Sequence, residues 1–276
     1  MDIVLAALVV IPLLIVARWL RQNRRRRGLM SKPLPPEWIE LMRKSVALYR
    51  ILPESLKSEL HGRINVLMDE KTFEGCGGFE ITDEVKVVIA AQACILLLNR
   101  KASYFPSVDA ILVYPSAYFA EQAHPLGPVQ IKERNVRLGE SWVQGLVVLA
   151  WDHVEQKFLD VRGGHNVVLH EFAHQLDQED GRSDGTPVIK GREALGAWVR
   201  VMSREFTALR EKAARGEWDV LDAYGATNEA EFFAVATETF FEKPREFMAA
   251  HPEMYEQLKS FYRLDPEQWQ AVNHEP

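Results

Sequence analysis

The fold is decided by residues 167–177, which read VVLHEFAHQLD. Their apolar side chains recur with the period of an amphipathic helix, and Asn166 directly before them is a residue type that caps helix N-termini. Positions i and i+4 of a helix share one face, so His170 and His174 are predicted to point at one metal ion. The stretch therefore predicts a helix that carries two metal ligands.

Glu171 lies beside the first of these histidines and supplies a base. Zinc, at one ion per chain, would lower the pKa of a bound water to about 7. The Glu171 carboxylate can then take a proton as the water attacks a peptide carbonyl. The alternative is a helix with two surface histidines and a salt-bridged glutamate, which the apolar context of the motif disfavours. We predict a zinc metallopeptidase with a peptide or protein substrate.

A catalytic zinc site needs a third protein ligand. A histidine six residues after the second is ruled out, because Asp180 occupies that position. Spacing leaves two candidates open: Glu193, about twenty residues on, and Glu231, at the start of another apolar helix. Glu231 also has a structural explanation, because it forms a capping box with Asn228. Glu238, seven residues further on, would share its helical face and could support a ligand or merely be a satisfied charge.

The rest of the chain predicts one mixed domain at residues 28–276. The protein has 276 residues, 47% of them hydrophobic, and its two cysteines exclude a disulfide framework. Beyond residue 27 it carries 27 basic and 38 acidic residues, so we expect no direct nucleic-acid binding. We predict an α+β fold with helices around a small sheet: helices at 37–49, 53–71, 82–98, 166–177, 193–213, 228–242 and 253–263, and strands at 110–114 and 142–151.

Residues 1–27 predict a membrane anchor. Ile3 to Ala17 contains no charged residue, Trp19 suits a membrane interface, and six arginines lie between Arg18 and Arg27. Because positive charges stay in the cytoplasm, we expect a single-pass transmembrane helix in the bacterial inner membrane, with the catalytic domain on the cytoplasmic side. The arginines should also favour anionic lipid head groups. The alternative is an apolar helix packed on the protein's own domain, which would then be cytoplasmic.

Several segments together resemble a known family. HEFAHQLD (170–177) with QEDG (178–181), Tyr224, EFFAV (231–235) and AAQAC (90–94) resemble the Mlc titration factor A family of bacterial zinc peptidases. The resemblance covers about residues 33–265. The family is similar to the catalytic domain of anthrax lethal factor, which implies a zincin-like fold.

The resemblance implies a ligand set and a function. The family's third zinc ligand is a glutamate with a tyrosine seven residues before it, a spacing that Tyr224 and Glu231 reproduce. It therefore implies Glu231 as the third ligand and Tyr224 as a hydrogen-bond donor to the oxyanion. It further implies aminopeptidase action on short peptides and sequestration of the repressor Mlc, which regulates sugar uptake. A regulatory binding protein with a slow or vestigial zinc site is the alternative.

Asp177 is open to two interpretations from the sequence. It lies on the same helical face as His170 and His174, so its carboxylate could orient a ligand histidine through the second ring nitrogen. It could equally close the helix or hold the following loop.

Overall fold

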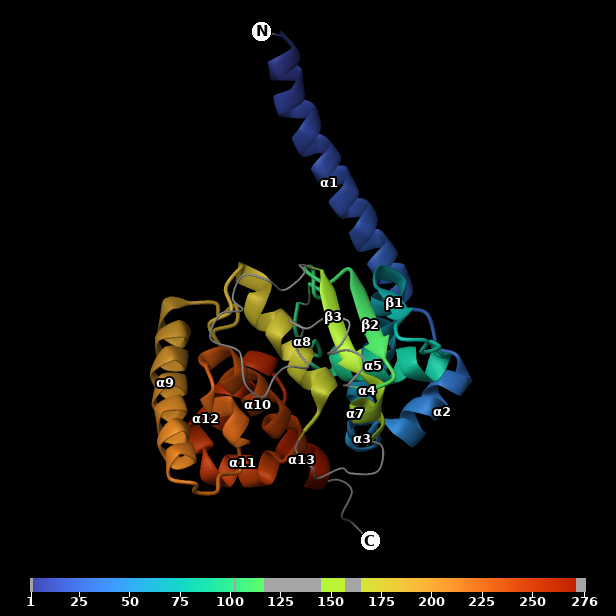
Figure 1. Ribbon diagram of the computed structural model, residues 1–276. Helices are drawn as coiled ribbons and strands as arrows, with labels where there is room; N and C mark the ends of the chain where they lie inside the picture. Colours follow the sequence, from blue (N-terminus) through green and yellow to red (C-terminus); the bar gives the residue numbers. More distant parts are fainter. Residues whose placement is uncertain (1, 102, 117–144, 157–164, 272–276) are drawn as a thin grey trace.

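A computed structural model describes residues 2–101, 103–116, 145–156 and 165–271, and the side chains of all of these except residues 2–9, 270 and 271. The elements in order are α1 (Asp2–Met30), α2 (Pro36–Ser45), α3 (Ala47–Ile51), α4 (Glu54–Glu70), β1 (Thr72–Gly75), α5 (Asp83–Ile95), β2 (Ala110–Tyr114), β3 (Leu146–Ala150), α7 (Trp151–Gln156), α8 (Val167–Asp177), η2 (Gln178–Asp180), α9 (Arg192–Ala214), η3 (Ala223–Ala226), α10 (Glu229–Glu242), α11 (Pro244–Ala250), α12 (Pro252–Tyr262) and α13 (Pro266–Ala271). The prediction of helices around a small sheet is confirmed in this part of the chain (Figure 1).

The three described strands form a parallel sheet in the order β1-β2-β3. Thr72 pairs with Ala110, and Ala110 pairs with Leu146. The central strand β2 is buried throughout, as its run of apolar residues predicted. The strand predicted at 142–151 is confirmed as Leu146–Ala150, whereas residues 142–144 lie outside the described residues and Trp151 already begins α7. The sequence analysis did not predict β1.

The central helix is α5, as its uniformly apolar sequence predicted. The Thr82 hydroxyl accepts a hydrogen bond from the Val85 amide at 3.3 Å, which caps the helix as expected. From Val87 to Ile95 every residue is buried, and α5 packs against α2, α4 and α8. Burial also raises the pKa of the Cys94 thiol, which agrees with an inert cysteine.

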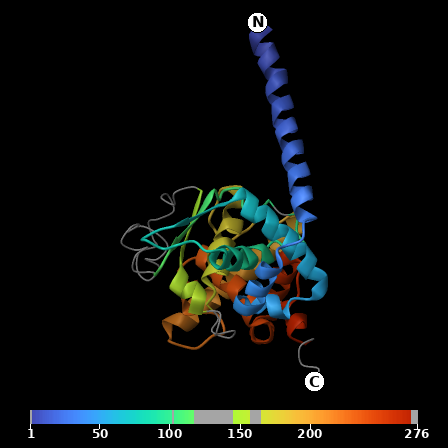
Figure 2. The same cartoon turned by 90° about the vertical axis from the view of Figure 1, so that its right-hand side faces the viewer.

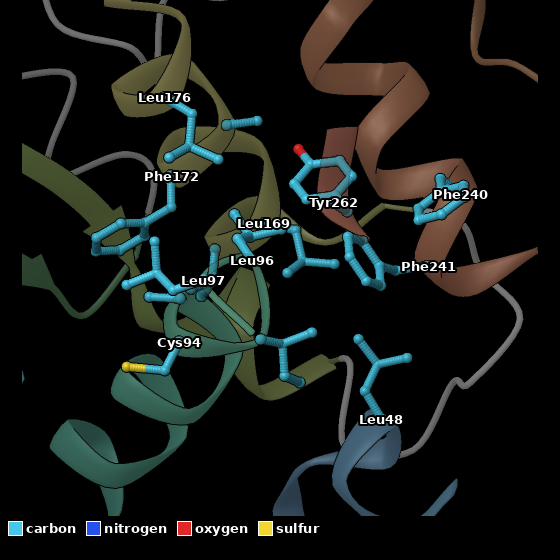
Figure 3. Close-up of a cluster of buried hydrophobic side chains, with 14 of the residues drawn as sticks. Leu48, Cys94, Leu96, Leu97, Leu169, Phe172, Leu176, Phe240, Phe241 and Tyr262 are labelled. Carbon is cyan, nitrogen blue, oxygen red and sulfur yellow. The ribbon is translucent and has the colours of Figure 1, made fainter. Parts of the chain in front are cut away.

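A second apolar layer joins α8 to the C-terminal helices (Figure 3). Leu169, Phe172 and Leu176 from α8 belong to one buried cluster with Leu96 and Leu97, which follow α5, and with the aromatic residues Phe240, Phe241 and Tyr262. The Phe172 ring meets the Phe105 ring edge-on, with 4.7 Å between the centroids. The apolar face of α8 is packed in this cluster, and the helix also contacts α10.

One helix predicted from the sequence is divided in the structure. The helix expected at 37–49 is interrupted at Val46, whose extended backbone (φ −122°, ψ 99°) separates α2 from α3. The residue is buried, so tertiary packing outweighs the helical periodicity there.

The N-terminal helix α1 projects from the body in both views (Figures 1 and 2). Its helical part was predicted correctly. Its membrane-spanning part is not confirmed: among the residues that the structure describes, no helix combines the length and the hydropathy needed to cross a bilayer. The side chains of Ile3–Val9 lie outside the described ones.

Candidate metal centre

Two capped helices present the residues of the site to each other. In α8 the Asn166 side chain accepts a hydrogen bond from the Leu169 amide at 3.1 Å, and in α10 the Asn228 side chain accepts one from the Glu231 amide at 2.9 Å. Both caps were predicted from the sequence. Because α8 packs against α10, the polar face of the first helix meets the first turn of the second.

His170, His174 and Glu231 converge at this contact. The Nε2 atoms of the two histidines lie 3.2 Å apart, and Glu231 Oε2 lies 2.9 Å from His170 Nε2 and 3.4 Å from His174 Nε2. All three side chains are buried, and one ligand atom of each lies within 4.8 Å of the others. Two imidazole nitrogens and a carboxylate oxygen aimed at one point form the donor set that a divalent zinc ion takes. The residues therefore fit a metal ion.

Glu238 fixes the first imidazole from behind. Its Oε1 lies 2.6 Å from His170 Nδ1, and its Oε2 accepts a hydrogen bond from the Asn166 amide at 2.6 Å. A carboxylate on Nδ1 leaves the Nε2 lone pair of a neutral imidazole free for a ligand role. Burial lowers the pKa of His170, but the charge of Glu238 and hydrogen bonds to Glu231 and Glu238 outweigh it, so this pKa lies well above its usual range.

Glu171 lies within the same buried cluster and is 3% exposed. Burial raises the pKa of its carboxyl, although His170 and His174 partly oppose the shift. A carboxylate with a raised pKa is a better proton acceptor than an exposed one, which is the property that a general base needs.

Tyr224 reaches the site from the short helix η3. Asp222 begins this helix by accepting a hydrogen bond from the Tyr224 amide at 2.7 Å. The Tyr224 ring is half-buried, and its centroid lies 6.1 Å from that of His170. The fold thus places the predicted tyrosine beside the first histidine, although 54 residues separate the two in the chain.

The structure also places the residues that the sequence left open. Glu193 is exposed in the first turn of α9 and is not part of the histidine cluster, whereas Glu231 is. Asp177 holds the following loop, since its Oδ2 accepts a hydrogen bond from the Gly185 amide at 3.0 Å. Burial raises the pKa of Asp177 to about 6.

Sequence reasoning missed the polar contacts around Asn166. Its side-chain amide donates to Gln92 Oε1 at 2.6 Å and to Glu242 Oε1 at 3.0 Å, so one residue links α5, α8 and α10. A signal was present in α10, where Glu231, Glu238 and Glu242 follow at spacings of seven and four and so share one face.

Comparison with known proteins agrees with this geometry. A sequence profile described as glucose-regulated metallo-peptidase M90 matches residues 20–263. An uncharacterized protein of Synechocystis sp. is 40% identical over 244 residues, which are 88% of this chain and 89% of that protein. Mlc titration factor A of Escherichia coli O1:K1 is 31% identical over 238 residues, 83% of this chain and 86% of that protein, and the Shigella flexneri protein of this name matches equally well.

These similarities define the class of protein: the matching profile is that of a metallopeptidase family, which implies a metal, and the buried cluster could bind one. The chain belongs to the glucose-regulated metallo-peptidase M90 family, which is a family of zinc metallopeptidases. The predicted resemblance to the Mlc titration factor A family is thereby confirmed.

Proposed function

We propose that this protein is a zinc-dependent peptidase, with the metal held by His170, His174 and Glu231. The observation that carries the proposal is the convergence of these three buried side chains next to the buried Glu171. Bound zinc supplies a Lewis acid that polarises the peptide carbonyl and acidifies water.

The remaining steps belong to side chains of this chain. Glu171 accepts the proton of the attacking water and later returns it to the leaving amine, a dual role that its raised pKa favours. Glu238 keeps the His170 ring in one orientation through its bond to Nδ1. Tyr224, beside that ring, donates a hydrogen bond to the oxygen on which negative charge develops.

The variant Glu171→Gln tests this proposal, because it removes the base and leaves the three ligands in place. We expect kcat for a peptide substrate to fall by about 10²- to 10⁴-fold, with the zinc content unchanged. Glu193→Gln is the matched control, since Glu193 is exposed on α9. Hydrolysis by the Glu171→Gln protein at the unmodified rate would rule out the proposed mechanism.

The finer substrate class is a proposal that rests on family resemblance. We propose aminopeptidase action on short peptides. Matched peptides with a free and with an acetylated amino terminus separate the possibilities: an aminopeptidase cleaves only the first, whereas an endopeptidase cleaves both.

A regulatory partner is the second candidate function, favoured by the 31% identity to a protein named for titrating Mlc. We propose that a transcriptional repressor of the Mlc type binds this chain, with regulation of sugar uptake as the consequence. If binding alone is the function and the zinc site is slow or vestigial, the wild-type protein binds the repressor and hydrolyses no peptide. Repressor binding that survives Glu171→Gln, while hydrolysis is lost, indicates that the chain has both functions.

We further propose that residues 1–27 attach the domain of residues 28–276 to the cytoplasmic face of the bacterial inner membrane. Leu13, Leu14 and Ile15 of α1 are 62%, 64% and 62% exposed and lie on a helix that leaves the body (Figure 2). A lipid bilayer would cover this apolar surface and remove it from water. Membrane fractionation of cells expressing the full chain tests this, and recovery in the soluble fraction would favour the cytoplasmic alternative.

A further inference from the structure

A pocket of about 510 Å³ lies where α1 meets the body. Arg18, Arg21, Gln22, Arg25 and Arg26 line it from α1, at helix positions i, i+3, i+4, i+7 and i+8. Residues at this spacing share one face of a helix, so a single stripe of α1 points into the pocket. Its volume lies within the range of small-molecule binding sites.

Two of these arginines already have partners on the end of α4. Arg26 forms a bidentate pair with Glu70, at 2.7 Å from Nε and 2.8 Å from Nη2, and Arg25 Nη2 lies 2.6 Å from Asp69. These pairs fix the angle at which α1 leaves the body. They therefore hold the rest of the arginine stripe in place.

Arg18 and Arg21 are exposed and form no ion pair with any described residue. Lys71, which also lines the pocket, donates hydrogen bonds to the carbonyls of Phe105 and Val108 at 2.8 and 2.6 Å. Five cations and three carboxylates line the pocket, which leaves an excess of two positive charges. The pocket is thus suited to an anion that can bind to guanidinium groups.

The pocket lies directly below the apolar part of α1. Val16, Trp19 and Leu20 are 51%, 59% and 45% exposed, and Arg18 and Arg21 lie on the same turns of the helix. Tryptophan and arginine at the end of an apolar helix mark the depth of lipid head groups. If the apolar part of α1 enters a bilayer, the pocket opens at the level of the phosphates.

We propose that this pocket binds the phosphate of an anionic phospholipid head group, with Arg18 and Arg21 as the ligands. This inference rests on the membrane association proposed above and adds a specific site to it. Guanidinium groups bind phosphate oxygens in a bidentate manner, whereas a diffuse basic surface attracts phosphate without such defined contacts. Occupation of the pocket would seat the catalytic domain at a fixed distance from the membrane.

Vesicle flotation with the full chain tests the proposal, using phosphatidylcholine vesicles with and without phosphatidylglycerol. The test variant is Arg18→Gln with Arg21→Gln. The matched control is Arg24→Gln with Arg27→Gln, which removes the same charge from exposed arginines that do not line the pocket. Retained peptide hydrolysis and an unchanged circular dichroism spectrum show that each variant is folded.

We expect the test variant to lose affinity for phosphatidylglycerol vesicles on the order of tenfold, and the control to lose much less. Equal losses in both variants would overturn the proposal, because they indicate diffuse attraction to the surface. Equal wild-type binding to both kinds of vesicle would also overturn it, while leaving the membrane association intact. Absence of binding to either kind would refute both.

Free phosphate shares the chemistry of the head group and is a separate arm of the test. Titration of the full chain with inorganic phosphate in the absence of vesicles should give weak binding at most. Tight binding that requires Arg18 and Arg21, without any preference for phosphatidylglycerol, would identify a soluble phosphate ligand and overturn the lipid assignment.

Discussion

The contact between Glu238 and His170 gives the sharpest prediction, because both oxygens of Glu238 act as acceptors. Oε1 bonds to His170 Nδ1 and Oε2 to the Asn166 amide, each at 2.6 Å. In Glu238→Gln only one acceptor remains, so an NH₂ group must face either the amide or the imidazole. Facing the imidazole, it favours the tautomer with a proton on Nε2, and that proton blocks the nitrogen aimed at Glu231.

We expect Glu238→Gln to weaken zinc binding by about 10- to 100-fold, the usual effect of losing a carboxylate behind a ligand histidine. This equals about 1.4 to 2.8 kcal/mol of binding free energy. Competition with a chromophoric chelator of known zinc affinity measures the change, and Glu246→Gln, at an exposed glutamate of α11, is the control. Zinc affinity within about twofold of wild type in Glu238→Gln would refute the orienting role of this carboxylate.

Two further predictions concern stability. Phe172→Ala removes a fully buried ring and should lower the free energy of unfolding by about 3 to 5 kcal/mol, measured by urea denaturation; a loss below about 1 kcal/mol would contradict the packing described here. His251 bonds to Asp219 and Glu205, each at 2.9 Å, and although burial lowers its pKa, these bonds raise it above 6.5. The contribution of His251 to the free energy of unfolding should therefore be complete below about pH 6.5 and disappear as the pH rises through the pKa of His251 in the folded state. Urea denaturation of wild type and His251→Gln across this range measures it, and a constant difference between them would contradict the prediction.

The local part of the site was predictable from the sequence. The motif at His170–His174, the Asn166 and Asn228 caps, and the buried helix α5 all follow from residue type and helical period, which act over a few residues. The choice between Glu193 and Glu231 was different. It depends on α10 packing against α8 across 61 residues of sequence, and helical period carries no information about such a contact.

The sheet shows the same limit. β2 is buried on both faces, and its five consecutive apolar or aromatic residues predict a buried strand. β1 is a four-residue strand of largely exposed residues, TFEG, without an alternating pattern. It forms a strand because its backbone pairs with β2, so its structure is decided by a partner 38 residues away.

The charges buried in the site give an independent argument for a cation. Glu171, Glu231 and Glu238 are all at most 6% exposed, and their described ion pairs are with imidazoles and not with lysine or arginine. Burial of a carboxylate costs several kcal/mol unless a positive charge or several hydrogen bonds offset it. Without a metal ion, a protonated His170, whose pKa is raised, offsets part of this charge. Imidazoles that bind a metal are neutral, so in the metal-bound site a divalent cation would compensate the carboxylates in place of that proton.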